Sequence, residues 1–186
     1  PAICALLGVL LAAPALQAAS LTVVPTRVVL EGQRLSASLT VRNESEEPAL
    51  IQIETLRWTQ AVPTIRTEPS RDLLAVPPIF RLPPGAEQTV RVGLRIHPPD
   101  GPERTYRLLL SEVTTDEDLQ QGGVRFALRL SIPVFVRARA VEEQLIARLQ
   151  SGAREWMVAV HNAGTVHARL IAVKVRDRSG ASLTVE

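Results

Sequence analysis

The side chains that could carry metal or acid–base chemistry are few and widely spaced in this chain. The three histidines are His97, His161 and His167. The last two are six residues apart and have no cysteine or carboxylate beside them, which predicts polar surface residues and no metal site. Carboxylates gather in ESEE (44–47) and DED (116–118), a pattern typical of solvated turns and not of a paired general acid and base.

Motifs for nucleophilic catalysis and for nucleotide binding are absent from the sequence, which has no G-x-S-x-G, no P-loop and no G-x-G-x-x-G. The basic residues are 20 arginines and the single Lys174, and they alternate with apolar residues along predicted strands. Nucleic-acid recognition needs a basic stripe with stacking aromatic residues, which this arrangement lacks. We therefore expect no enzyme, no cofactor, no metal and no nucleic-acid partner.

Residues 1–19 predict part of a secretory signal peptide. The apolar run ICALLGVLLAAPAL (3–16) is short for a membrane span, and small residues follow it. With cleavage near Ala18 or Ala19, we expect export and no stable membrane insertion afterwards. No basic segment precedes the run, so we expect that the start of the signal is missing. The only cysteine, Cys4, lies inside the signal, so the mature chain would fold without a disulfide.

Short alternating segments separated by polar turns fill residues 20–137, and EQTVRVGLRI (87–96) is a clear example. This pattern predicts an all-β fold, an antiparallel immunoglobulin-like β-sandwich. The proline-rich segment 75–85 predicts at most a short edge strand flanked by bends, with the Val76–Pro77–Pro78 step a candidate cis site. The strand pattern restarts in 141–186, which is too short for another sandwich, so we expect an incomplete second β-sandwich domain there.

The segment VRFALRLSIPVFVR (124–137) has more apolar residues on one face than a strand on a core requires, since a strand of average length has about five or six residues. Two interpretations stay open. The strand is covered entirely by the opposite sheet, or its first half lies at a sheet edge and offers side chains to a partner. Pro133 favours the edge, because proline lacks the donor for a ladder hydrogen bond. The apolar face consists of Val124, Phe126, Leu128, Leu130, Ile132, Val134 and Val136.

Several segments in order resemble the PapD-like periplasmic pilus chaperones of the chaperone–usher pathway. They are VPTRVVL (24–30), TVRN (40–43), PPIFRLPPGAEQTVRVGLR (77–95), ERTYRLLLSE (103–112) and LRLSIPVFVR (128–137). The resemblance implies two immunoglobulin-like domains set as a boomerang, and a periplasmic protein that stabilises pilus subunits and delivers them to an outer-membrane usher. The SIPVFV form and the missing disulfide resemble the archaic or alternative branch. The alternative is a secreted structural immunoglobulin-like pilus subunit or an adhesin-type protein.

In this family the chaperone lends a strand to the subunit, and two basic residues hold the subunit's C-terminal carboxylate. The resemblance implies Arg27 as the first of these anchors. The second is a lysine on the lent strand in the best-known members, and Pro133 occupies its position here. Arg107 and Arg125 are the alternatives for the second anchor. The side chains implied to enter the subunit are Val124, Phe126, Leu128 and Leu130, with Ile132 as an extension of the row.

Three further residues carry structural expectations. Arg137 precedes the link between the two predicted domains. It is expected either to set the angle between them, with a partner in the second domain, or to be a surface charge. Trp58 and Trp156 are expected in the cores of the first and second domains, because large aromatic side chains are usually buried.

Overall fold

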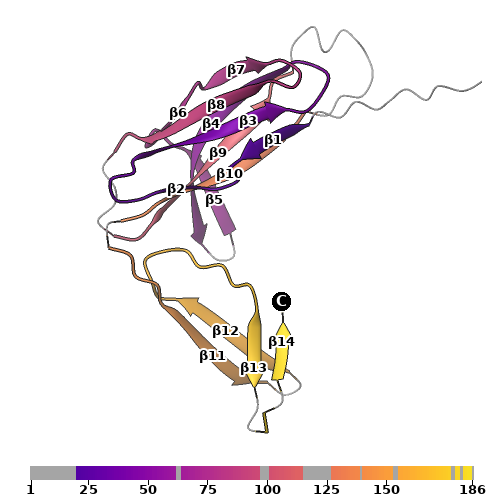
Figure 1. Ribbon diagram of the computed structural model, residues 1–186. Helices are drawn as coiled ribbons and strands as arrows, with labels where there is room; N and C mark the ends of the chain where they lie inside the picture. The colour runs from indigo at the N-terminus through magenta and orange to yellow at the C-terminus, as the bar shows by residue number, and fades with distance from the viewer. Residues whose placement is uncertain are drawn as a thin grey trace, which may run out of the picture.

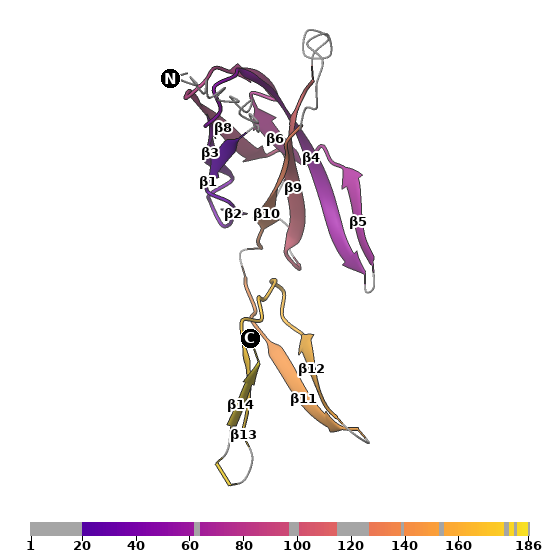
Figure 2. The same cartoon turned by 90° about the vertical axis from the view of Figure 1, so that its right-hand side faces the viewer.

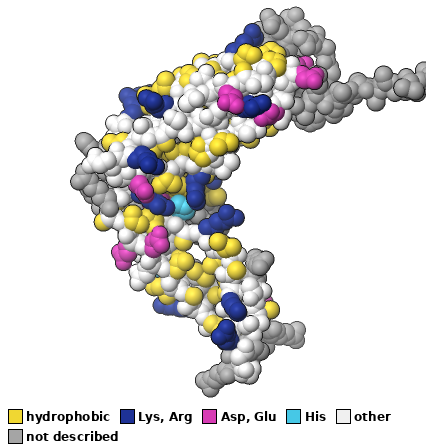
Figure 3. Space-filling view, in the orientation of Figure 1, with side chains coloured by type: hydrophobic (Ala, Val, Ile, Leu, Met, Phe, Trp, Pro, Cys, Tyr) yellow, Lys and Arg dark blue, Asp and Glu magenta, His cyan; other side chains and the backbone are white. Residues whose placement is uncertain are grey.

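The computed structural model describes residues 20–61, 64–96, 101–114, 127–138, 140–152, 155–176, 179–180 and 182–185. All regular elements in these ranges are β-strands, and they form two lobes set at an angle around a hollow (Figures 1 and 3). The first lobe contains residues 20–138, and the second contains the remaining described residues. Within the described ranges, no helix is long and apolar enough to cross a membrane.

Two packed sheets build the first lobe. One has the order β1-β3-β8-β6, and the other has the order β2-β10-β9-β4-β5, with β7 paired to β4. Figure 2 shows the second sheet from β2 across to β5. Every pairing is antiparallel except that of β2 with β10, which is parallel. The strands are β1 Leu21–Val24, β2 Val28–Leu30, β3 Ser36–Asn43, β4 Ala49–Ala61, β5 Thr64–Pro69, β6 Leu73–Val76, β7 Ile79–Leu82, β8 Glu87–Leu94, β9 Arg104–Glu112 and β10 Arg129–Val136.

The core lies between these sheets and follows the alternation of the sequence. Because successive side chains of a strand point to opposite faces, the apolar residues at every second position face the other sheet. Fully buried examples from four strands are Leu39, Val41, Val90, Val92, Tyr106, Leu108, Leu110, Val134 and Val136. Asn43 is also buried, and its Nδ2 donates to the carbonyl oxygens of Glu47 and Leu82 at 2.7 and 3.0 Å. The predicted all-β sandwich is confirmed.

Two local features differ from the sequence-based expectation. The predicted first strand, residues 20–30, is two strands in different sheets, because the chain leaves the first sheet after Val24 and joins the other at Val28. Strand β5 was not predicted, and all six of its residues are exposed, so it has no apolar alternation. The bond between Val76 and Pro77 is cis, as the sequence suggested.

The second lobe consists of two hairpins. Strand β11 (Leu145–Ser151) pairs with β12 (Trp156–Asn162), and β13 (Val173–Arg176) pairs with β14 (Ser182–Val185). Trp156 is 69% exposed, so its predicted place in a core is wrong for this structure.

Candidate functional site

Strand β10 has one edge that is only half occupied. It pairs with β9 along its whole length, and with β2 only from Val134 to Val136. On the β2 side, Arg129–Pro133 has no strand partner among the described residues. The ladder with β9 continues beyond β10, since the Glu112 N–H donates to the carbonyl oxygen of Leu128 at 2.9 Å. This edge therefore presents free backbone donors and acceptors on which another strand could add.

The side chains along this edge divide into two groups. Ile132 is 6% exposed and packs in the lobe's own core, together with Val134. Leu128 and Leu130 are only half-buried, and Leu130 packs against the margin of that core. The rest of the predicted row, Val124 and Phe126, lies outside the described residues, as does Arg125.

Two arginines flank Pro133, the position that the resemblance implied for the second anchor. Arg107 on β9 lies directly opposite Pro133 on β10. Val28 lies opposite Val134, so continuing this register by one residue places Arg27 level with Pro133 on the other side. Neighbouring strands are about 4.8 Å apart, so the backbone positions of the two arginines are about 10 Å apart. The two arginines therefore start on either side of Pro133 across the sheet.

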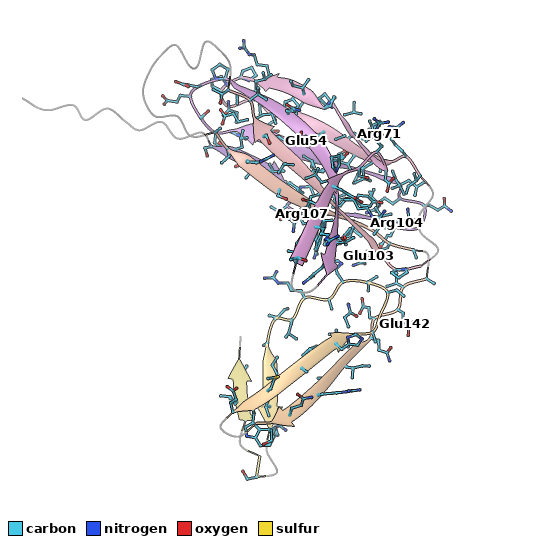
Figure 4. All side chains as sticks on the ribbon, turned by 180° about the vertical axis from the view of Figure 1, so that it is seen from behind. Glu54, Arg71, Glu103, Arg104, Arg107 and Glu142 are labelled. Carbon is cyan, nitrogen blue, oxygen red and sulfur yellow. The ribbon has the colours of Figure 1, made fainter. Side chains whose placement is uncertain are left out.

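Arg107 is held on the outer face of the sheet by two contacts. Its Nη1 donates to Ser131 Oγ at 3.2 Å, and its Cζ lies 4.9 Å from the centroid of the Trp58 ring. Figure 4 shows Arg107 on β9, above Glu103 at the waist between the lobes. Trp58 is half-buried and does not belong to the core cluster, so its predicted core role is wrong.

The waist contains a buried carboxylate, that of Glu103, whose side chain is 3% exposed. Arg137 donates to it at 3.1 Å and also lies 3.4 Å from Glu31, so its direct partners belong to the first lobe and not to the second. Glu103 in turn binds His167 of the second lobe, with 2.7 Å between Oε1 and Nδ1. The His167 ring stacks on Phe135 of β10 at a centroid distance of 3.8 Å. The end of β10 that pairs with β2 therefore contacts the second lobe through Phe135.

The sequence does not mark Glu103 or Phe135, and the expectation of a polar surface residue is wrong for His167, which binds Glu103 and stacks on Phe135. No local pattern marks these residues, because their contacts join positions 32 to 64 residues apart. Within the described ranges no group of three or more histidine, cysteine or acidic residues could hold a metal.

Burial, and then a 2.8 Å hydrogen bond to Asp72, raise the pKa of Tyr106 to about 12.

Residues 20–142 match the family described as pili and flagellar-assembly chaperone, PapD N-terminal domain. The chain belongs to this family. A relative in the same functional class is the chaperone protein FaeE from Escherichia coli, which is 28% identical over 126 residues. The aligned part covers 67% of this chain and 46% of FaeE, so the chain spans less than half the length of the curated relative that it matches.

Solved structures of a fimbrial chaperone and of chaperone–subunit complexes share the fold. The class 5 fimbriae chaperone CfaA matches with a TM-score of 0.66 and 17% identity, over 89% of this chain and 79% of CfaA. A chain of the CsuC–CsuE chaperone–tip adhesion subunit complex from archaic Csu pili of Acinetobacter baumannii gives 0.62 and 17%, over 89% and 82%. A chain of the Salmonella enterica SafA pilin–SafB chaperone complex gives 0.60 and 19%, over 82% and 72%.

Proposed function

We propose that this PapD-family chain is a periplasmic chaperone that binds pilus subunits by donor-strand complementation and delivers them to an outer-membrane usher. The observation that carries the proposal is the half-open edge of β10, with accessible apolar side chains beside two arginines. Similar structures include a chaperone with its pilin, SafB with SafA, and a chaperone with its tip subunit, CsuC with CsuE. The proposed role needs no catalysis, cofactor or metal.

Strand addition supplies the first part of the binding energy. A subunit strand would form a hydrogen-bonded ladder with Arg129–Pro133, while Leu128 and Leu130 enter the subunit's open groove. Val124 and Phe126 continue this row in the sequence. Each fully buried leucine or phenylalanine side chain contributes about 1.5–3 kcal/mol, from which the ordering and association costs are subtracted. We leave Ile132 out of the lent set, because the chaperone's own core buries it.

The two arginines supply the second part by holding the subunit's C-terminal carboxylate. A guanidinium binds a carboxylate through two parallel charge-assisted hydrogen bonds. Pro133 carries no charge, and Arg107 directly opposite it replaces the lysine of the better-known members. We therefore assign the pair to Arg27 and Arg107, and prefer Arg107 to Arg125 because of this register.

The proposal also assigns a role to each part of the chain. Residues 20–137 would form the N-terminal chaperone domain, and 141–186 the start of a second β-sandwich domain on the other side of the hollow. Residues 1–19 would direct export. Membership of a chaperone family argues against the alternative of a structural pilus subunit or adhesin.

Co-expression with a subunit of the same pilus system tests the proposal. The wild type should yield a stable 1:1 complex from the periplasm. Leu128→Glu should abolish that complex while the lobe stays folded, because a charge cannot enter an apolar groove. Leu74→Glu is the matched control, since Leu74 is 49% exposed on β6 of the other sheet. Equal recovery of subunit with both variants would remove the lent-strand assignment.

A further inference from the structure

Arg107, the second arginine proposed to hold the subunit's carboxylate, lies one strand away from the open edge of β10. A side chain at position 133 would stand on β10 itself, whereas Arg107 starts on β9, about 4.8 Å further from the edge. A free arginine samples many rotamers, and ordering it on binding reduces affinity. Arg107 therefore serves the edge best if the free protein already holds its guanidinium in place.

Trp58 and Ser131 hold this guanidinium from the two strands on either side of β9. Leu56 on β4 lies opposite Arg107, so Trp58, two residues further along, is its diagonal neighbour on the same face. The 4.9 Å from Cζ to the ring centroid is within the range of a cation–π contact. Ser131 on β10 accepts a hydrogen bond from Nη1.

Core packing does not explain why a tryptophan stands at position 58. The side chain is half-buried and lies outside the core cluster. Its Nε1 is buried without a hydrogen-bond partner among the described residues, although buried donors are nearly always paired. An apolar side chain at this position would have no orphan donor. The indole instead offers the aromatic face that binds cations best.

From these contacts we infer that Trp58 is a positioning residue, which holds Arg107 ready beside Pro133 for the carboxylate of a subunit. The inference rests on the proposed chaperone function. It differs from a purely structural role in one respect: the effect of Trp58 on subunit binding must pass through Arg107.

A double-mutant cycle tests this dependence. The subunit complex of each variant is diluted into an excess of tagged wild-type chaperone, and the rate of subunit transfer is measured. Trp58→Leu should speed release by about two- to fivefold, the fold-change that corresponds to a cation–π contact at a partly exposed site. Trp58→Phe, which keeps an aromatic face, should restore most of the wild-type residence time. In the Arg107→Ala background, Trp58→Leu should have no further effect.

Two outcomes would overturn the inference. One is a full effect of Trp58→Leu on top of Arg107→Ala, and the other is equal damage from Trp58→Phe and Trp58→Leu. Failure of the proposed function looks different, because the wild type would then form no complex, or Arg107→Ala would release subunit at the wild-type rate. Thermal melts of the free variants show whether each remains folded.

Discussion

Removal of the Arg107 side chain should weaken subunit capture far more than it weakens the fold. In the free protein, Arg107→Ala loses one hydrogen bond to Ser131 and the contact with Trp58, both at a partly exposed site, so the stability cost is about 1–2 kcal/mol. In the complex it would also lose a charge-assisted bond to the carboxylate, worth about 1.5–3 kcal/mol. The subunit should therefore bind about ten- to a hundredfold less tightly.

The transfer assay described above measures this difference, with thermal melts to follow stability. Arg91→Ala is the matched control, because Arg91 is an exposed arginine on β8 of the other sheet. Arg107→Lys keeps the charge but not the paired hydrogen bonds, so it should fall between wild type and alanine. Adding Pro133→Lys to Arg107→Ala should recover much of the lost affinity, since it returns a cation to the open edge.

The reasoning fails if Arg107→Ala and Arg91→Ala release subunit equally slowly while Arg27→Ala releases it quickly. That result would mean that a single arginine holds the carboxylate, and that the position of Arg107 opposite Pro133 has no role in binding.

The remaining predictions concern the waist, a titration and a turn. Glu103→Gln should lower the free energy of unfolding in urea by about 2 kcal/mol, because it weakens charged hydrogen bonds to a buried carboxylate that joins the lobes. Wild-type stability should fall as pH rises from 10 through about 12, because the unfolded chain loses the Tyr106 proton first. Tyr106→Phe should lack this fall and should be less stable at pH 7, where Asp72 loses its donor; equal slopes in urea titrations would contradict the assignment. Gly85→Ala should cost about 1–2 kcal/mol in a thermal melt, because Gly85 has φ +67° in open space, where only the backbone conformation opposes a side chain.

The alternation of apolar residues made the sandwich predictable. In β8, Val90 and Val92 point to the core because the period of a strand is two, and the sequence shows that period directly. The same period in β10 predicted the burial of Val134 and Val136. The period could not show at which residue of β10 burial in the protein's own core begins. In the structure, that boundary lies between the half-buried Leu130 and the buried Ile132.

Features set by pairing between distant segments could not be predicted in this way. Strand β5 has no buried residue, so it leaves no periodic signal, and it forms because β4 extends far enough to pair with it. Phe135 points away from the first core and is buried by His167 of the second lobe. The place of Arg107 opposite Pro133 depends on the register of two strands whose connecting segment is long, and register is not written in either strand alone.

The parallel pairing of β2 with β10 gives the open edge a fixed length. Beyond Pro133 the edge is taken, because β2 runs in the same direction and pairs from Val134 onward. A guest chain running parallel to β10 would meet the start of β2 head to tail and could advance no further. The start of β2 therefore limits how far an added strand can extend along β10. A guest that is one residue too long would have to shift every side chain to the wrong face of its own sheet.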